Sequence, residues 1–181
     1  MQAKIPETAT RKEKILFALR AIVFAVLLAA LMSYTLYVLV PKYDYGICSI
    51  TNLYQQEDDT VDVLVLGTSL AYGGGNTNVL WEEYGIAAYN LCGAEQPYWI
   101  SYYYLQEALK TQHPQVIVLD AKPAPYPDDY SRRGRAFLGT TGIKDPIIRL
   151  RALLSSVAPE NYASFVAGFP QLHSYYPDVT L

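Results

Sequence analysis

The sequence predicts an α/β domain with a parallel sheet, preceded by one transmembrane helix. Three observations favour this: a chargeless apolar run at 21–40, three short apolar runs typical of buried strands, and a helical pattern between the second and third runs. The chain has 181 residues, and outside the apolar run it has room for one domain. We expect a cytoplasmic tail at 1–14, an anchor at 15–40, a membrane-proximal linker at 41–60 and the α/β domain at 61–181.

Composition excludes several classes of protein. The chain holds 14 Lys and Arg against 17 Asp and Glu, for a net charge of -3, so it lacks the basic surface of a nucleic-acid binder. Two cysteines exclude a four-cysteine zinc site, and two histidines leave little for a histidine-rich metal centre. We therefore expect no metal and no cofactor. The 17 tyrosines argue against disorder.

The run from Ala21 to Val40 predicts a membrane anchor. Its 20 uncharged residues would span about 30 Å as a helix, which matches a bilayer core. The apolar stretch of a signal peptide is shorter, roughly 7–15 residues, and a small-residue cleavage site follows it. Basic residues concentrate before the run, which places the N-terminus in the cytoplasm and the domain outside: Lys4, Arg11, Lys12, Lys14 and Arg20. The prediction is a single-pass protein of the cell membrane, with the lipid bilayer as a partner. The alternative is a buried core helix.

Three apolar runs, at 61–66, 87–91 and 116–119, predict the strands of one sheet. Nearly continuous apolar runs are typical of strands that are buried on both faces. A short helix at 79–84 fits between the first two strands. A second helix begins at Pro97, and its expected packing face comprises Ser101, Tyr104, Leu105, Ala108 and Leu109. The order strand, helix, strand predicts a right-handed parallel crossover.

The pattern loosens after the third strand. Asp145 and Pro146 predict a helix start, with an apolar face of Ile147, Ile148, Leu150, Leu153 and Leu154. Another helix is expected from Pro159 and Glu160. Three strands are fewer than the roughly five of a doubly wound sheet. We therefore expect an incomplete domain that belongs to a longer protein.

The loop after the first strand holds the main candidate for chemistry, Ser69. Ligands of parallel sheets bind beyond the carboxyl ends of the strands, and Ser69 follows the last apolar strand residue, Leu66, by three positions. Gly67 permits the tight turn that would raise the hydroxyl off the sheet, as a nucleophile requires. The same loop could bind an anion through its amides, or Ser69 could cap the next helix. Local sequence leaves these three readings open.

A resemblance favours the nucleophile. The stretch VDVLVLGTSLAYGG resembles the first block of the SGNH (GDSL-like) hydrolases, with Gly67-Thr68-Ser69-Leu70 where that family has Gly-Asp-Ser-Leu. The stretch YGIAAYNLCGAEQPYWISYYYLQEALKTQHPQVIVLD is also similar, above all to the membrane-anchored bacterial branch that handles D-alanyl or acetyl esters of envelope polymers. The resemblance implies a flavodoxin-like three-layer fold. It also implies an esterase or acyltransferase that acts on O-acyl groups of a cell-envelope glycan, which would then be a partner.

The resemblance also assigns roles to residues. Ser69 would be the nucleophile, and its own N–H would be one oxyanion donor, with Gly93 as a second donor. Asn90 aligns with an asparagine of the family's second block, whose glycine falls near Glu95. After the third strand the family has Gly-x-Asn, whereas this chain has Asp120-Ala121-Lys122. The expected substrate loops contain Thr68, Asn90, Glu95 and Asp120.

The general base is the main departure from the family pattern, which has Asp-x-x-His near the end of the domain. His113 precedes the third strand, at the opposite edge of the sheet from Ser69, and His173 has no Asp three residues before it. We expect both histidines to be surface or structural residues and this stretch to be inactive without another base. The missing base also supports a second function class, a non-catalytic membrane-tethered binding or scaffolding module with a relic hydrolase fold.

Three other features have two readings each. Cys48 and Cys92 could form a disulfide outside the cytoplasm or remain buried thiols. The aromatic cluster at 98–104 could stack on sugar rings, although packing of a helix against the sheet is the expected role. The arginines at 132–135 could meet anionic polymer or lipid headgroups, with a solvated loop as the ordinary reading.

Overall fold

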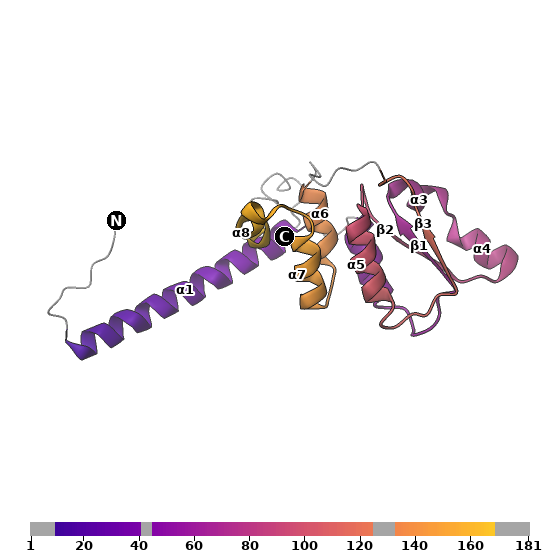
Figure 1. Cartoon of the computed structure of the whole chain (residues 1–181). Helices are drawn as coiled ribbons and strands as arrows, with labels where there is room; N and C mark the ends of the chain where they lie inside the picture. Colours follow the sequence, from indigo (N-terminus) through magenta and orange to yellow (C-terminus); the bar gives the residue numbers. More distant parts are fainter. Residues whose placement is uncertain (1–9, 41–44, 125–132, 169–181) are drawn as a thin grey trace.

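The computed structural model describes residues 10–40, 45–124 and 133–168. In chain order the elements are α1 (Arg11–Leu39), α2 (Tyr45–Leu53), β1 (Val63–Gly67), α3 (Ser69–Gly74), α4 (Thr77–Tyr84), β2 (Ala88–Cys92), α5 (Tyr98–Ala108), β3 (Val116–Leu119), α6 (Arg133–Thr141), α7 (Pro146–Leu154), the 3₁₀ turn η1 (Pro159–Asn161) and α8 (Tyr162–Ala167). The arrangement is mixed α/β, with one long helix extending from the rest (Figure 1).

The long helix α1 begins at a capping box. The Glu13 carboxylate accepts a hydrogen bond from the Thr10 amide at 2.7 Å, and the Thr10 hydroxyl oxygen accepts one from the Glu13 amide at 3.4 Å. The most apolar 18-residue window of α1 has a mean hydropathy of 2.7 and no buried residue. Within the described ranges, α1 is the one helix that is long and apolar enough to cross a membrane. The predicted helix at the anchor position is therefore confirmed.

The sheet has three parallel strands in the order β2-β1-β3. Val63 of β1 lies opposite Ala88 of β2 and Val116 of β3, so β1 is the central strand. All three predicted strands are confirmed within a residue or two of their expected bounds. The carboxyl ends of the strands lie together at one edge of the sheet, where Gly67, Cys92 and Asp120 meet.

Helices cover the sheet in layers. α5 lies on one side of β1 and β2, and α3 and α4 lie on the other, while α6 and α7 form a further layer outside α5 (Figure 1). The main core lies between α5, α2 and the sheet, and its fully buried members include Ile50, Leu64, Leu91, Ile100 and Tyr104. A second core joins α6, α7 and α8 to the end of α1, around Phe137 and Phe165, whose rings meet edge to face.

The prediction of a linker at 41–60 needs correction, because α2 lies inside it and belongs to the domain. Ile47, Ile50 and Leu53 of α2 are buried in the two cores. The hydroxyl of Tyr104 on α5 lies 3.1 Å from the Gly46 carbonyl oxygen and 2.6 Å from that of Gly139 on α6. The apolar residues at intervals of three in this helix are a sequence signal that the linker prediction did not use.

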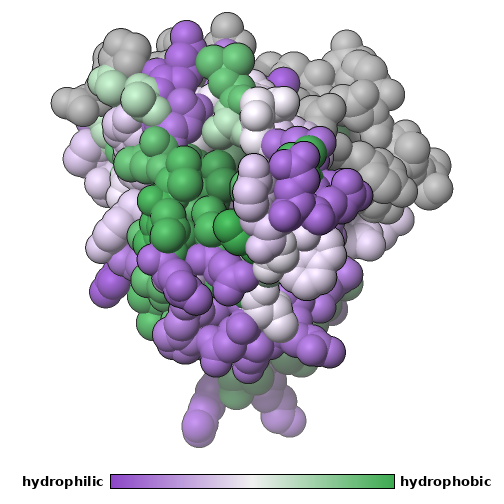
Figure 2. All heavy atoms as spheres, turned by 90° about the vertical axis from the view of Figure 1, so that its right-hand side faces the viewer, coloured by the Kyte–Doolittle hydropathy of each residue, from purple (hydrophilic) through white to green (hydrophobic). Residues whose placement is uncertain are grey.

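The expectation that the third strand is buried on both faces is wrong. The side chains of β3 remain between 44% and 54% exposed: Val116, Ile117, Val118 and Leu119. The physical reason is position, since β3 is an edge strand and the helices of both layers pack on β1 and β2. Figure 2 shows the face that carries α4 and β3, where a continuous hydrophobic patch runs between hydrophilic side chains.

The helices at 97–109 and 145–154 are confirmed, but their packing faces differ in part. On α5, Leu109 is exposed, whereas Ile100 and Glu107 are buried, because α5 packs against α7 as well as the sheet. On α7, Ile147 and Leu150 are exposed. The aromatic cluster of α5 serves mainly packing, as expected: Tyr104 is fully buried, and Trp99 and Tyr103 pack against the cores. Part of the arginine-rich stretch, from residue 133, is helical, which differs from the expected loop.

Candidate functional site

Ser69 lies where the sequence places it, beyond the carboxyl end of the central strand. It is the first residue of α3, and its side chain is exposed. Within the described ranges, neither the hydroxyl nor the amide N–H of Ser69 takes part in a hydrogen bond. A nucleophile and an oxyanion donor both need this freedom, since each must meet the substrate. The capping reading is not supported, because the cap of α3 is Thr68, whose hydroxyl accepts the Leu70 amide at 3.3 Å.

Asp120 connects the end of β3 to the start of α3. Its carboxylate accepts hydrogen bonds from the Thr68 hydroxyl at 2.5 Å and the Thr68 amide at 3.1 Å, and from the Lys122 amide at 2.8 Å. Burial raises the pKa of Asp120, but these hydrogen bonds outweigh it and hold the pKa below its ordinary value. The two predicted loop residues Thr68 and Asp120 are therefore brought together, as a fixed pair beside Ser69 and not as a base aimed at it.

Gly93 and Glu95 follow β2 at the same edge. The Gly93 amide donates to the Gly67 carbonyl oxygen at 3.1 Å, so an oxyanion role for Gly93 requires that bond to open. Glu95 has a φ of 51°, in the left-handed region that glycine adopts most readily. This is the position near which the family pattern has its glycine. Glu95 therefore adopts a backbone conformation that favours glycine, although it is not a glycine.

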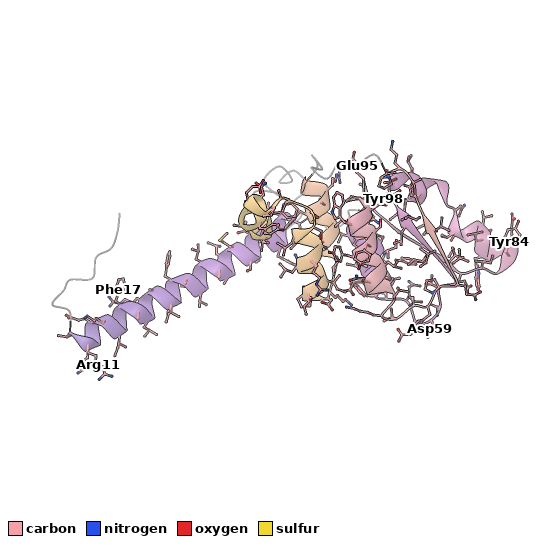
Figure 3. The ribbon with its side chains drawn as sticks, viewed as in Figure 1. Arg11, Phe17, Asp59, Tyr84, Glu95 and Tyr98 are labelled. Carbon is pink, nitrogen blue, oxygen red and sulfur yellow. The ribbon has the colours of Figure 1, made fainter. Side chains whose placement is uncertain are left out.

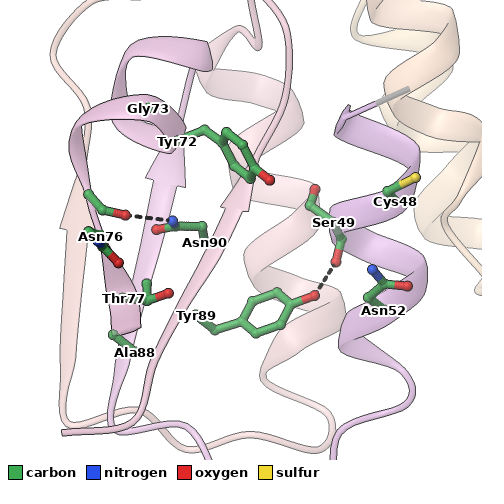
Figure 4. Close-up of a pocket in the computed structure, with 11 residues that line it drawn as sticks. Cys48, Ser49, Asn52, Tyr72, Gly73, Asn76, Thr77, Ala88, Tyr89 and Asn90 are labelled. Atoms are coloured by element: carbon green, nitrogen blue, oxygen red, sulfur yellow. Dashed lines mark hydrogen bonds between the residues drawn. The ribbon is translucent and has the colours of Figure 1, made fainter. Parts of the chain in front are cut away.

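Asn90 lines a cavity of about 490 Å³ between α2, α3 and β2 (Figure 4). Its side-chain amide donates to the Gly75 carbonyl oxygen at 2.9 Å, and its Oδ1 atom is buried with no partner among the described residues. Tyr89 lies beside it, with its hydroxyl donating to the Ser49 carbonyl oxygen at 2.7 Å, and burial raises the Tyr89 pKa to about 12. Ser69 is not among the residues that line this cavity.

Sequence reasoning missed the polar wall that α2 gives to this cavity. Cys48, Ser49 and Asn52 face it from α2, opposite Tyr72 and Asn76. The omission follows from the linker prediction, since a linker places no side chain in a fixed position. Cys48 and Cys92 do not form a disulfide in this structure; Cys92 is buried and Cys48 is half-buried. Burial raises the pKa of the Cys92 thiol to about 12.

No histidine accompanies Ser69 among the residues that the structure describes. His113 is exposed, and its ring pairs with the Asp59 carboxylate before β1. Figure 3 shows Asp59 and Glu95 at opposite ends of the domain, and Glu95 follows β2 at the carboxyl edge where Ser69 lies. The expectation that His113 sits at the wrong edge is confirmed. His173 lies outside the described residues.

Comparisons with family models, with curated proteins and with solved structures give no match to this chain. The likeness to the SGNH hydrolases therefore stands on the residues quoted for it. Likewise, no group of three or more histidine, cysteine, aspartate or glutamate side chains that could hold a metal ion occurs in the described part of the chain.

Proposed function

We propose that this chain is a membrane-anchored, extracytoplasmic SGNH-like domain that transfers or hydrolyses O-acyl groups of a cell-envelope glycan through Ser69. One observation carries the proposal: an exposed serine, without a hydrogen-bond partner among the described residues, stands at the tip of the central strand. The sequence around it, Gly67 to Leu70, supports the same assignment. The apolar helix α1 supports anchoring, and the basic residues before its apolar run support a cytoplasmic N-terminus.

In the proposed reaction the Ser69 Oγ attacks the carbonyl carbon of an O-acyl ester. The serine proton passes to a base. The bond between the acyl carbon and the glycan oxygen then breaks, and that oxygen takes the proton from the base and leaves as a hydroxyl, which yields an acyl-enzyme. Water or a second hydroxyl then releases the acyl group. The Ser69 amide, which has no partner within the described ranges, would donate a hydrogen bond to the developing oxyanion. The base would have to be supplied by the full-length protein, because His113 pairs with Asp59 at the other edge of the sheet and His173 is expected to be a surface or structural residue.

A fluorophosphonate probe on the full-length protein, which would supply the base, tests the serine assignment. The wild type should be labelled, Ser69→Ala should lose the label, and the control Ser164→Ala, an exposed serine of α8, should keep it. Labelling that persists in Ser69→Ala would reject the assignment. Alkaline carbonate extraction of membranes tests the anchor separately, since a protein held by α1 should stay in the pellet.

The second candidate is a non-catalytic tethered binding or scaffolding module. Two hydrogen bonds favour it, because they already use groups that a catalytic site would need. The Gly93 amide donates to the Gly67 carbonyl oxygen, and the Asp120 carboxylate accepts from the Thr68 hydroxyl. This alternative predicts that the folded wild type takes up no probe at all, even at millimolar concentration. Labelling at Ser69 would exclude it.

A further inference from the structure

A second cavity, of about 530 Å³, lies where the end of α1 meets α2, α6, α7 and α8. Its wall is mainly apolar, with Leu36 and Val40 from α1, Phe137 from α6, Leu153 from α7 and Val166 from α8. These elements lie together at the left of the domain in Figure 1. The volume falls in the range of roughly 300–1,000 Å³ that is usual for ligand sites.

Arg149 of α7 is the charged residue in this apolar wall. Its Nε atom is buried, and no hydrogen-bond acceptor reaches it among the residues that the structure describes. None of the ion pairs in the described ranges includes Arg149. Burial lowers the Arg149 pKa, yet a guanidinium stays protonated in proteins. A cation held in partly buried, apolar surroundings without a counter-charge is unfavourable, so this position favours an anionic ligand.

The position of the cavity along α1 points to the kind of anion. Ser33 and Leu36 belong to the last two turns of α1 and Val40 is its C-cap residue, so together they cover roughly 10 Å along the helix axis. They close the chargeless run that begins after Arg20. In a bilayer spanned by this run, the end of α1 lies at the boundary between acyl chains and headgroups. A phosphate and an apolar chain occur side by side at that depth.

We propose that this junction cavity binds an anionic phospholipid, with Arg149 on the headgroup phosphate and the apolar wall along part of an acyl chain. A guanidinium can bind two phosphate oxygens at once, which suits this contact. The apolar wall favours a lipid over a free phosphate ion, because a phosphate ion has no apolar part to contact Phe137 or Leu153. The proposal rests on the anchoring by α1 proposed above, and it is independent of the chemistry of Ser69.

Native mass spectrometry of the full chain in an uncharged detergent tests the site, with phosphatidylglycerol and phosphatidylcholine as probes. The wild type should retain one phosphatidylglycerol in preference to phosphatidylcholine. Arg149→Gln should weaken phosphatidylglycerol binding by at least about tenfold and abolish the preference, because it removes the charged hydrogen bonds. The matched control Arg151→Gln, on the exposed side of the same helix, should bind like the wild type.

A second variant keeps the test decisive if Arg149→Gln folds poorly. Val166 lines the cavity from its exposed rim, so Val166→Trp should fill the space and reduce retention of both lipids while Arg149 stays in place. Undiminished phosphatidylglycerol binding in folded Arg149→Gln or Val166→Trp would overturn the proposal, and so would competition by millimolar inorganic phosphate. Carbonate extraction separates the two proposals, because loss of the protein from the membrane pellet would reject the anchor itself.

Discussion

At the scale of single residues, Gly67 determines how closely the ends of β1 and β3 approach. A Cβ atom at this position would lie 2.2 Å from the Cβ of Asp120, far inside any real contact. The absence of a side chain therefore allows Asp120 to reach the Thr68 amide and hydroxyl. The φ angle of Gly67 is one that any residue can adopt. Glycine is needed at this position because Asp120 lies so close to it, and not because the backbone conformation demands it.

Gly67→Ala should destabilise the domain by about 1–3 kcal/mol, because backbone or Asp120 must move to make room. Gly73→Ala is the matched control, since its added methyl group would meet nothing within 4 Å, and it lies in the same short helix that Ser69 begins. That control should be neutral or up to about 1 kcal/mol more stable. Urea unfolding of the chain in detergent measures both, and equal effects of the two variants would contradict this account.

Sequence reasoning at this scale identified Gly67 and the exposure of Ser69, because both follow from the local order of strand, glycine and helix. It did not identify the pairing of Thr68 with Asp120, which are 52 positions apart. A tight-turn argument was also given for Gly67, whereas the structure requires it for close packing. Asn90 was placed near the serine by likeness alone, and the side chain instead lines a separate cavity with α2.

At the scale of elements, a buried carboxylate holds α5 against α7. The Glu107 side chain is 2% exposed and accepts hydrogen bonds from the Tyr54 hydroxyl, the Lys110 ammonium and the Asp145 amide at 3.0, 3.0 and 3.2 Å. Lys110 also donates to the Asp145 carboxylate at 2.7 Å. Asp145 in turn caps α7 by accepting the amides of Ile147 and Ile148. One network thus fixes a helix start and a contact between helices.

This network predicts a loss of stability in acid. The hydrogen bond from Lys110, followed by those of the α7 amides, lowers the Asp145 pKa to about 2 from its ordinary value of 3.8. A lowered folded-state pKa stabilises the protein fully above pH 3.8, and that contribution declines as the pH falls towards 2. Asp145→Asn keeps the cap, since asparagine is as good an N-cap, and it should weaken this acid dependence.

Thermal unfolding of wild type and Asp145→Asn between pH 5 and pH 2 measures the effect. Lys110→Gln serves as a second variant, because it removes the main cause of the lowered pKa and should also flatten the profile. A wild-type stability that stays constant from pH 4 to pH 2 would be incompatible with the network as described.

The start of α7 was predictable because a cap depends on neighbouring residues, and Asp145-Pro146 contains all of the signal. The buried faces were less predictable. Glu107 would be placed on a solvent face by any polarity pattern, yet Tyr54 and Lys110 satisfy its carboxylate inside the fold. Which side of a helix is covered depends on elements distant in sequence, as the exposed Ile147 demonstrates.

At the scale of the whole molecule, the sheet ends in an uncovered strand. The side chains of β3 are exposed on both faces, and its outer edge has no neighbouring strand among the described residues. Unprotected apolar edges of this kind promote association between chains. The parallel arrangement of the strands was predictable from the order of strands and helices. The exposure of β3 was not, because it depends on where α6 and α7 pack, and they pack outside α5 and away from β3.

Ile117→Lys should reduce self-association of the full chain in detergent and change its stability by less than about 0.5 kcal/mol. Leu109→Lys is the matched control, because both side chains are 44% exposed but Leu109 lies at the end of α5 and not on a sheet edge. Sedimentation velocity over a range of concentrations separates the two variants. A wild type that stays monomeric at every concentration would show that the edge of β3 does not promote self-association.

The junction of α1 with the domain has a consequence for reach. Leu36, Leu39 and Val40 pack against the same cluster as Ile47 and Phe137, so the end of the helix contacts the domain directly. In the proposed anchored state, this contact would restrict the height of the Ser69 hydroxyl above the bilayer. Any polymer that it modifies has to bring its acyl groups to that height.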